Sequence, residues 1–384
     1  MAGVLFGVFM KAVVSAKELK TALKALKNIV DSFQDIKTEF YYGFNVTDKG
    51  LCLQAIGSLY ASYCLTSQYE SFDFFTPVDP SLLSTFKFPE DEIKIEIKDS
   101  ALKAVSGSFE VELALPHMTA PPIKLKEIPL VYKFEVESFT KALNFHTYGI
   151  HHNPIEASKR VVSLRSGEGK LHLQSFDKQV SAFNSLPSLT NIEDVIYLTP
   201  KPVLSALNDI SDKEIHFGVS KQFWRICSDK LDVYYPNMVK PVVGNFSSIL
   251  TEMETKPCIK VGFKKDLLKK SLMVLAPSIK AGKEDNPKMY LYVQDSKVSV
   301  TVSSDRIKSM KFDLEADVQP DRLLLDGTAL GVNFRYTKEF VDKLDGDLVY
   351  FQYWKYQDDN APLKGRVLSF YNDYGRYIIG RISL

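Results

Sequence analysis

The chain has little cysteine, and its few cysteines form no metal-binding or disulfide pattern. Cys52, Cys64, Cys227 and Cys258 include no CxxC pair and no regular framework within 384 residues. We therefore expect neither a disulfide nor a zinc knuckle. Because disulfides are rare where thiols are kept reduced, this usage favours a cytoplasmic protein.

Long apolar runs are also lacking. No stretch approaches the ~20 residues that are needed to cross a bilayer. The apolar segment before Ala16 resembles the core of a signal peptide, but no basic residue precedes it. We expect a short tail that leads into a first strand.

Neither sign of charge is in excess. Lys and Arg number 48 against 47 Asp and Glu, and the net charge is +1. Such a balance does not indicate a nucleic-acid-binding protein unless the positive charge is gathered on one face. The length is sufficient for two or three domains with separate cores.

Catalytic motifs are missing. The Gly-Glu-Gly-Lys segment at 167–170 lacks the spacing of a phosphate-binding loop, and we expect a hairpin turn there. His151 and His152 are adjacent, so they cannot form a metal-binding pair one helical turn apart. There is no HExxH, no GxSxG and no Cys/His cluster. We predict no metal, no cofactor and no enzymatic activity, although missing motifs alone do not exclude an enzyme.

What the chain does contain is a threefold internal repeat. An extended apolar residue is followed, five and nine positions later, by two residues that would anchor one face of a helix. The three sets are Val14, Leu19 and Leu23; Phe134, Phe139 and Leu143; and Phe263, Leu268 and Leu272.

A second helical cluster recurs after each of these segments. Its apolar residues stand at positions i, i+1 and i+4, beginning at Leu82, Val203 and Phe340. Asp79-Pro80 and Thr199-Pro200 are typical helix starts, with a capping residue before proline. Alternating strand patterns follow at 93–97, 215–219 and 348–353.

Two linkers divide these repeats into domains. Residues 116–129 are rich in proline, and residues 245–257 are polar and end in Lys-Pro. We predict an α+β fold of three repeated modules, each an antiparallel sheet with two helices, at 1–130, 131–257 and 258–384. Three copies of one module suggest an arc or a ring rather than an enzyme cleft.

The first predicted helix is basic on one side. Ser15 and Glu18 have the spacing of a capping box. Beyond them, four lysines fall within an ~80° stripe opposite the apolar face: Lys17, Lys20, Lys24 and Lys27.

The other copies carry basic residues at related places. These are Lys141 and His152 in the second module, and Lys264, Lys265 and Lys269 in the third. If the modules orient alike, these side chains share a concave surface suited to the phosphates of duplex DNA, without sequence readout. The alternative is a set of ordinary solvated lysine faces.

Several stretches resemble the bacterial-type beta sliding clamp of the replicative DNA polymerase. The similarity covers nearly the whole chain from Met10, and the order and spacing of the stretches are its specific part. They are VIYLTPKPVL at 195–204, YPNMVK at 235–240, GVNFRYTKEFVDKL at 331–344 and YIIGRISL at 377–384.

The resemblance implies a ring formed by a head-to-tail homodimer. Such a ring encircles double-stranded DNA and tethers the polymerase. The first module of one subunit would meet the third module of the other, with Phe109 and Val111 facing Leu275 and Ile279. Alternatively, Phe109 and Val111 belong to their own core or to an exposed sheet edge.

The resemblance also implies a pocket that binds short peptides from the polymerase and the clamp loader. Its residues would be Phe176, Asp177, Lys178, Gln179, Val180, Ser181, Pro236, Lys240, Ile378, Ile379, Gly380, Arg381 and Ile382. The alternative is that the isoleucines near the C-terminus complete a core sheet.

This chain departs from the family at the pocket. The family's Asp-Gly-His-Arg-Leu is Asp-Lys-Gln-Val-Ser at 177–181, and its Met-Pro-Met is Gly-Arg-Ile at 380–382. A divergent clamp with another peptide preference fits these changes, for example one encoded by a large phage and acting in the host cytoplasm. An enzyme built on repeated α+β modules with an unrecognised carboxylate site, or a particle component, remains an alternative.

Overall fold

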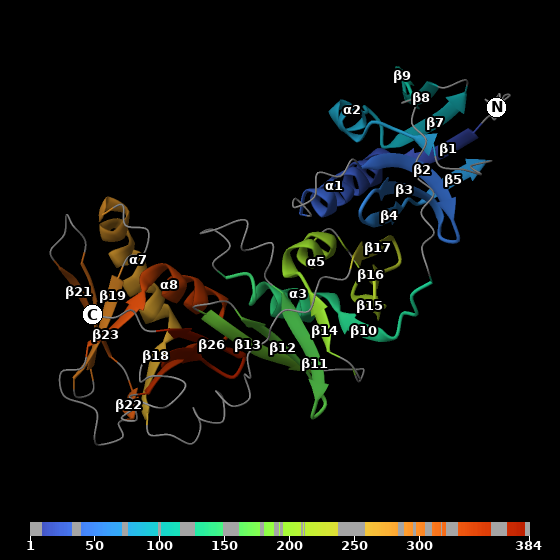
Figure 1. Ribbon diagram of the computed structural model, residues 1–384. Helices are drawn as coiled ribbons and strands as arrows, with labels where there is room; N and C mark the ends of the chain where they lie inside the picture. The colour runs from blue at the N-terminus through green and yellow to red at the C-terminus, as the bar shows by residue number, and fades with distance from the viewer. Residues whose placement is uncertain are drawn as a thin grey trace. The chain divides into compact units, whose positions relative to one another are not determined.

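The computed structural model forms two compact units, Met1–Thr140 with Ser188–Val239, and Lys141–Pro187 with Lys240–Leu384 (Figure 1). The structure describes residues 10–32, 40–70, 76–98, 101–115, 127–148, 161–176, 180–187, 192, 195–208, 210, 212–236, 258–282, 288–294, 297–303, 309–315, 317–319, 329–354 and 367–380.

One order of elements occurs three times: a strand and a helix, several strands, a second helix and three more strands. The first copy comprises β1 (Met10–Ser15), α1 (Ala16–Ser32), β2 (Tyr41–Thr47), β3 (Gly50–Ile56), β4 (Tyr60–Cys64), β5 (Ser67–Glu70), β6 (Thr76–Pro77), α2 (Pro80–Thr85), β7 (Glu92–Lys98), β8 (Ala101–Ser106) and β9 (Phe109–Ala114).

The second and third copies follow the same order. The second comprises β10 (Tyr132–Glu135), α3 (Val136–Asn144), β11 (Val162–Gly167), β12 (Lys170–Phe176), β13 (Val180–Pro187), β14 (Ile196–Leu198), α5 (Pro200–Leu207), β15 (Glu214–Val219), β16 (Phe223–Cys227) and β17 (Leu231–Pro236). The third comprises β18 (Cys258–Lys264), α7 (Lys265–Gly282), β19 (Lys288–Gln294), β20 (Lys297–Val302), β21 (Met310–Glu315), β22 (Asp317–Gln319), β23 (Ala329–Asn333), α8 (Phe334–Lys343), β24 (Leu348–Trp354), β25 (Val367–Tyr371) and β26 (Gly375–Gly380).

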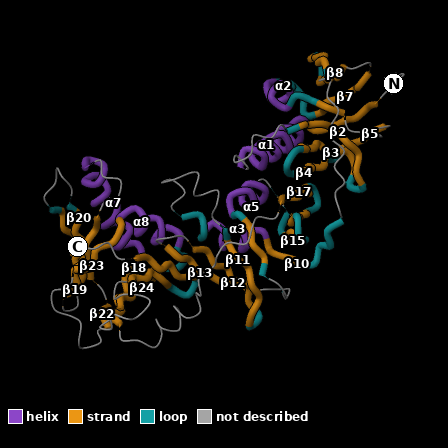
Figure 2. The backbone as a smooth tube through the Cα atoms, viewed as in Figure 1, coloured by secondary structure: helices purple, strands orange, loops and turns teal. Residues whose placement is uncertain are grey.

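The first unit contains two antiparallel sheets. One has the strand order β5-β1-β7-β8-β9, and the other β10-β15-β16-β17-β4-β3-β2-β6. The second sheet joins strands of two sequence copies, because β17 pairs with β4 at Leu231 and Tyr63. Helices α1 and α5 pack against each other in this unit (Figure 2). Their buried side chains include Leu23, Leu26 and Val203.

The start of α1 shows how that helix is held in place. The Ser15 hydroxyl accepts a hydrogen bond from the Glu18 backbone at 3.2 Å, as the capping box predicts. The Glu18 carboxylate does not complete the box. It accepts from the backbone and hydroxyl of Thr66 at 2.9 and 3.2 Å, and it pairs with Lys230 of the β16–β17 turn. This one carboxylate therefore ties α1 to both sequence copies in the first unit.

The second unit is built around the strand order β11-β12-β13-β26-β25-β24-β18-β22, beside a four-stranded sheet β21-β20-β19-β23. Here too one sheet joins two sequence copies, since β13 pairs with β26. Helices α7 and α8 pack together over a core that includes Leu272, Phe340 and Phe351. The predicted helix anchors Leu268 and Leu272 lie in that core.

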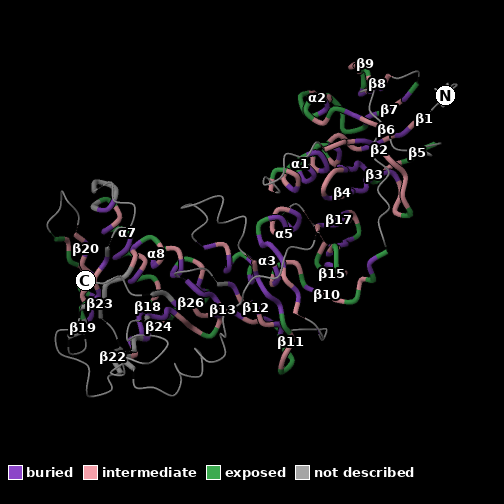
Figure 3. Tube along the Cα trace, in the orientation of Figure 1, coloured by how far each residue is buried: buried purple, intermediate pink, exposed green. Residues whose placement is uncertain are grey.

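The turn at 167–170 joins β11 to β12 as a tight hairpin, which confirms that prediction. Gly167 and Lys170 are partners, and Glu168 and Gly169 have φ of 54° and 72°. Positive φ at both central residues is the requirement of a type I′ turn, and glycine meets it without a steric cost. The turn is exposed (Figure 3).

The described elements confirm an α+β fold with antiparallel sheets and the repeated order of elements. The three domain boundaries at 130 and 257 remain a prediction. The two compact units do not follow those boundaries, because strands of the second copy join each unit. No helix in the described ranges is long and apolar enough to cross a membrane.

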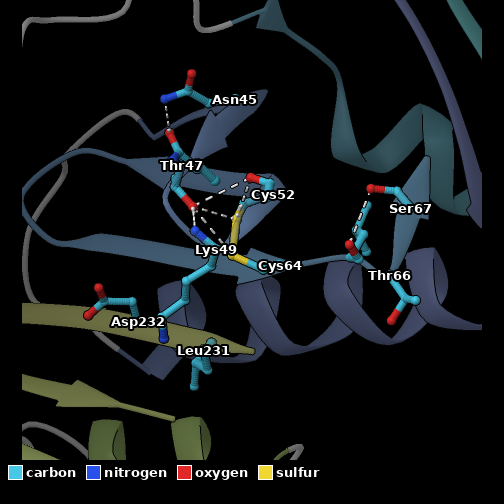
Figure 4. The surroundings of a disulfide bond; sticks show 12 residues. Asn45, Thr47, Lys49, Cys52, Cys64, Thr66, Ser67, Leu231 and Asp232 are labelled. Carbon is cyan, nitrogen blue, oxygen red and sulfur yellow. Dashed lines mark hydrogen bonds between the residues drawn. A yellow bond between two sulfur atoms is a disulfide. The ribbon is translucent and has the colours of Figure 1, made fainter. Parts of the chain in front are cut away.

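The prediction that the cysteines form no disulfide is wrong. Cys52 and Cys64 are bonded to each other (Figure 4). They are directly opposed partners on the neighbouring strands β3 and β4. Their separation of 12 residues carries no framework pattern, so the pairing follows from strand register alone. Cys227 is free and buried, and the Lys49 ammonium lies 3.1 Å from its sulfur.

Candidate DNA-facing and partner-binding surfaces

Helix α1 presents a basic face to solvent. Its buried residues include Leu19, Leu23, Leu26 and Ile29, and the four predicted lysines are all exposed on the other side. Lys17, Lys20 and Lys27 form no ion pair within the described ranges. Asp31 is exposed in the last turn and falls on the same angular stripe, so the stripe of positive charge ends before that residue. The α1 lysine face, defined as Lys17, Lys20, Lys24 and Lys27, is thus a run of positive charge about three turns long.

The second copy contributes less available charge. Lys141 on α3 forms an ion pair with Asp345, and its ammonium lies 5.4 Å from the centroid of the Tyr374 ring. The hydrogen bond from Lys141 lowers the pKa of the Asp345 carboxyl. His152 lies outside the described residues. The charge of Lys141 is therefore balanced within its own unit.

The third copy is also largely balanced. Lys264 is exposed, but the Lys265 ammonium donates to the Leu344 carbonyl, and burial followed by repulsion from Lys269 lowers the pKa of Lys265. Lys269 pairs with Asp342 at 3.1 Å, and Lys338 pairs with the same carboxyl group. Three lysines of α1, Lys17, Lys20 and Lys27, thus form no ion pair with a described residue, whereas Lys141 and Lys269 each do.

The predicted pocket residues meet where β13 begins and β26 ends. Val180 is the register partner of Ile379, and Ser181 is the partner of Ile378. The pairing brings together residues that are about 200 positions apart in sequence. Val180, Ser181 and Ile378 are 1%, 7% and 7% exposed. Gly380 ends β26.

The other predicted pocket residues lie at the ends of other strands or outside the described residues. The backbone of Phe176 ends β12 in the second unit, and Pro236 ends β17 in the first. Asp177, Lys178, Gln179, Lys240, Arg381 and Ile382 lie outside the described residues.

The predicted dimer contacts divide into edge and core residues. Strand β9 is an edge of its sheet. Phe109 and Val111 are half-buried there, and the Phe109 ring packs against Phe86 and Phe88 at centroid distances of 6.2 and 5.9 Å. Leu275 was predicted to face the second subunit. Its side chain is 0% exposed and lies in the core of the second unit.

Ile279 lies in the same core as Leu275 and is 6% exposed. The exposed apolar side chains of α7 are on the opposite face: Leu267, Met273 and Val274 are 36%, 67% and 49% exposed. Because Leu268, Leu272, Leu275 and Ile279 recur at helical spacing, the sequence itself contains this division.

No catalytic arrangement is evident among these groups. Within the described ranges, no cluster of three or more His, Cys, Asp or Glu side chains could hold a metal ion.

The chain was compared with protein families and with known proteins. No family model matches it, and no curated protein matches its sequence. Solved structures do match over nearly the whole chain. The beta subunit of DNA polymerase III from Thermotoga maritima has a TM-score of 0.78 at 13% identity and covers 98% of this chain and 100% of its own. The beta subunit from Pseudomonas aeruginosa has a TM-score of 0.77 at 12% identity, covering 97% and 100%.

A third match is a sliding clamp from Pseudomonas aeruginosa bound to griselimycin, with a TM-score of 0.79 at 13% identity, covering 98% of this chain and 100% of that one. At this level of identity, the similarity is one of fold. The chain has the fold of the DNA polymerase III beta subunits, as its sequence resemblance predicts.

Proposed function

We propose that this chain is a DNA sliding clamp, a ring that encircles duplex DNA and tethers a replicative DNA polymerase without making or breaking a bond. The observation that carries the proposal is the match of fold over 98% of the chain together with the exposed lysines of α1. A ring that cannot leave the duplex sideways keeps the polymerase at a high effective concentration near the primer end.

The α1 lysine face is the proposed main contact with DNA. Lysine is a strongly hydrated point charge that suits phosphate oxygens, and it reads no bases. Lys264 adds a lesser exposed charge, whereas Lys141 and Lys269 already have carboxylate partners. Direct affinity for DNA should accordingly be weak, salt-dependent and independent of sequence.

The ring is proposed to close by head-to-tail pairing of two copies, each contributing modules 1–130, 131–257 and 258–384. The edge strand β9 with Phe109 and Val111 would meet the third module of the second copy. On that module β21 is also a sheet edge, and Met273 and Val274 are exposed apolar residues of α7. Unpaired strand edges and exposed apolar side chains are suited to association.

Partner peptides are proposed to bind near the paired ends of β13 and β26. We name this the partner-peptide groove and define it by Phe176, Val180, Ser181, Ile378 and Ile379. The order of strands brings these residues together, and a related clamp fold holds griselimycin. An extended, apolar peptide from the polymerase or the loader is the proposed ligand.

An enzyme with an unrecognised carboxylate site is the competing proposal. It finds less support, because the fold of the chain matches a beta subunit of DNA polymerase III over 98% of its length. The proposed site of action is the cytoplasm, or that of the host if the chain is encoded by a phage.

The shape of the assembly tests this proposal. Light scattering should give a mass of about twice 43.4 kDa, and negative-stain electron microscopy should show a closed ring whose hole passes duplex DNA. A monomer with a single deep pocket would contradict the clamp and favour the enzyme.

A further inference from the structure

A buried histidine connects α3 to two strands of the second unit. His146 is 0% exposed. Its Nδ1 lies 2.7 Å from the Ser175 hydroxyl on β12, and its Nε2 lies 3.0 Å from the Asn184 carbonyl oxygen on β13. The Asn184 amide in turn donates to the Ala142 carbonyl of α3 at 3.2 Å. One imidazole thus links three elements.

The partners of His146 define its protonation. Because the Asn184 amide nitrogen donates to Ala142, its Oδ1 faces the histidine and can only accept. The hydrogen therefore lies on Nε2 of His146. In a neutral ring Nδ1 is then an acceptor, and the single Ser175 hydrogen goes to it over 2.7 Å rather than to the Tyr148 hydroxyl at 3.4 Å. The neutral imidazole satisfies each of these buried groups.

The same network reaches the partner-peptide groove. Ser175 immediately precedes Phe176, where β12 ends. The Tyr148 hydroxyl lies 3.4 Å from the Ser175 hydroxyl and donates to the Val180 carbonyl at 3.1 Å, where β13 begins. Val180 is the partner of Ile379 on β26. The end of β12 is therefore bonded to His146 through Ser175, and Tyr148, which holds the start of β13 at Val180, packs beside the same hydroxyl.

Strand β26 is held from the same side. The Tyr377 hydroxyl donates to the Phe145 carbonyl at 2.6 Å, one residue before His146. The Tyr377 ring stacks on Phe145 and Phe340 at centroid distances of 4.1 and 4.0 Å. Ile378 and Ile379 follow Tyr377 directly, so their backbone is positioned by this stack.

We propose that His146 is a positioning residue for the partner-peptide groove: its neutral imidazole holds the end of β12 and the start of β13 in the arrangement that an apolar peptide requires. This inference rests on the proposed clamp function, in which that groove receives the polymerase or the loader. His146 itself touches no ligand and acts through Ser175 and Asn184.

The charged and titratable groups around His146 come from each neighbouring element. Tyr148 follows α3, Tyr374 packs on Phe145 from the β25–β26 turn, and Tyr377 comes from β26. Burial raises the pKa of Tyr374 to about 12, so it stays neutral at physiological pH. Lys141 pairs with Asp345 nearby.

Lys343 of α8 donates to the Thr147 hydroxyl and pairs with Glu339, and Arg376 of β26 is the register partner of Phe183, next to Asn184. A second proton on His146 would place a charge in a fully buried site and would oppose the hydrogen from Ser175, so burial disfavours it. The ring therefore holds both strands in its neutral form.

The test uses the full-length protein and a fluorescein-labelled hexapeptide containing Leu and Phe, selected by binding to the wild type. Anisotropy gives Kd for His146→Phe, which fills the space but removes both hydrogen bonds, and for His146→Gln, which keeps a donor for Asn184. The matched control is His172→Phe on the same β12 strand. His172 stacks on Phe183, on the face of the sheet opposite Ser175.

We expect His146→Phe to raise Kd by at least about tenfold, because it removes two buried hydrogen bonds and a factor of ten corresponds to the loss of one of ordinary strength. His146→Gln should recover part of the affinity, and His172→Phe should bind like the wild type.

Each outcome bears on a different proposal. Equal Kd values for folded His146→Phe and wild type overturn the positioning role and leave the groove intact. If His146→Phe does not fold, a folded Ser175→Ala variant, which removes one of the two partners of His146, takes its place, and a wild-type Kd for it overturns the role instead. A wild type that binds no peptide but stays on circular DNA removes the groove and this inference while the clamp stands. A wild type that does neither removes the proposed function itself.

Discussion

Neutralising the α1 lysine face should reduce the salt dependence of DNA binding in a predictable way. The change is Lys17→Gln, Lys20→Gln, Lys24→Gln and Lys27→Gln together, in a helix whose exposed face these residues dominate. Each phosphate contact contributes about 0.9 to the slope of log K against log salt concentration. Loss of four contacts should therefore flatten the slope by up to about 3.6. Exposed substitutions of this kind leave stability within about 0.5 kcal/mol.

The assay is equilibrium binding to a short linear duplex at several salt concentrations. The matched control removes four lysines from the sheet of the same module: Lys11, Lys94, Lys98 and Lys103 lie on β1, β7 and β8. Both variants lose the same net charge, so a difference in slope reports which face meets the DNA. The reasoning is refuted if the control flattens the slope as much as the α1 variant, or if the α1 variant keeps the wild-type slope.

Four further changes test separate contacts. Phe109→Glu with Val111→Glu should convert the dimer to a folded monomer in light scattering, and an unchanged mass would show that β9 is not the subunit edge. Reduction of the disulfide, or Cys52→Ser, should lower the free energy of unfolding by about 2 to 3 kcal/mol in urea titration; equal midpoints with and without reductant would contradict this. Glu18→Ala should cost about 1 kcal/mol, because the Thr66 backbone and Lys230 lose the half-buried carboxylate that accepts from both, and a change within error would mean that water replaces the carboxylate. Deletion of residues 382–384 should abolish binding of the selected hexapeptide with little change in Tm, whereas a large fall in Tm would favour a core role.

Much of the fold could be predicted because it depends on local patterns. Leu19 and Leu23 are spaced for one face of a helix, and they are buried. The lysines at 17, 20, 24 and 27 are exposed for the same geometric reason. Asp79 caps α2 by accepting from the Ser81 backbone at 2.8 Å, as Asp before Pro indicates. Such features need only the period of the helix and the chemistry of its ends.

Features that depend on pairing between distant segments cannot be predicted from local sequence patterns. The opposition of Cys52 and Cys64 requires the register of β3 against β4, which no spacing rule supplies. His146 follows shortly after the basic residue Lys141 in sequence, but it is buried between Ser175 and Asn184. No sequence pattern near position 146 predicts that its side chain has partners on β12 and β13. The register of the two strands creates that environment.

Leu275 and Ile279 illustrate a different error. A family resemblance placed them at a subunit contact, while helical spacing places them with Leu268 and Leu272 on the buried face. The local physical pattern was correct there. Where position-by-position transfer across a divergent chain conflicts with helix periodicity, the periodicity is the better guide to burial.

Topological retention on DNA tests the central proposal most directly. Protein loaded on a nicked circular plasmid should pass through gel filtration in high salt with the DNA, because escape requires opening a subunit interface rather than breaking phosphate contacts. Cutting the plasmid once should then release the protein. Equal retention on circular and linear plasmid, or loss from both as the salt rises, would show that the chain holds DNA by contact alone and is not a sliding clamp.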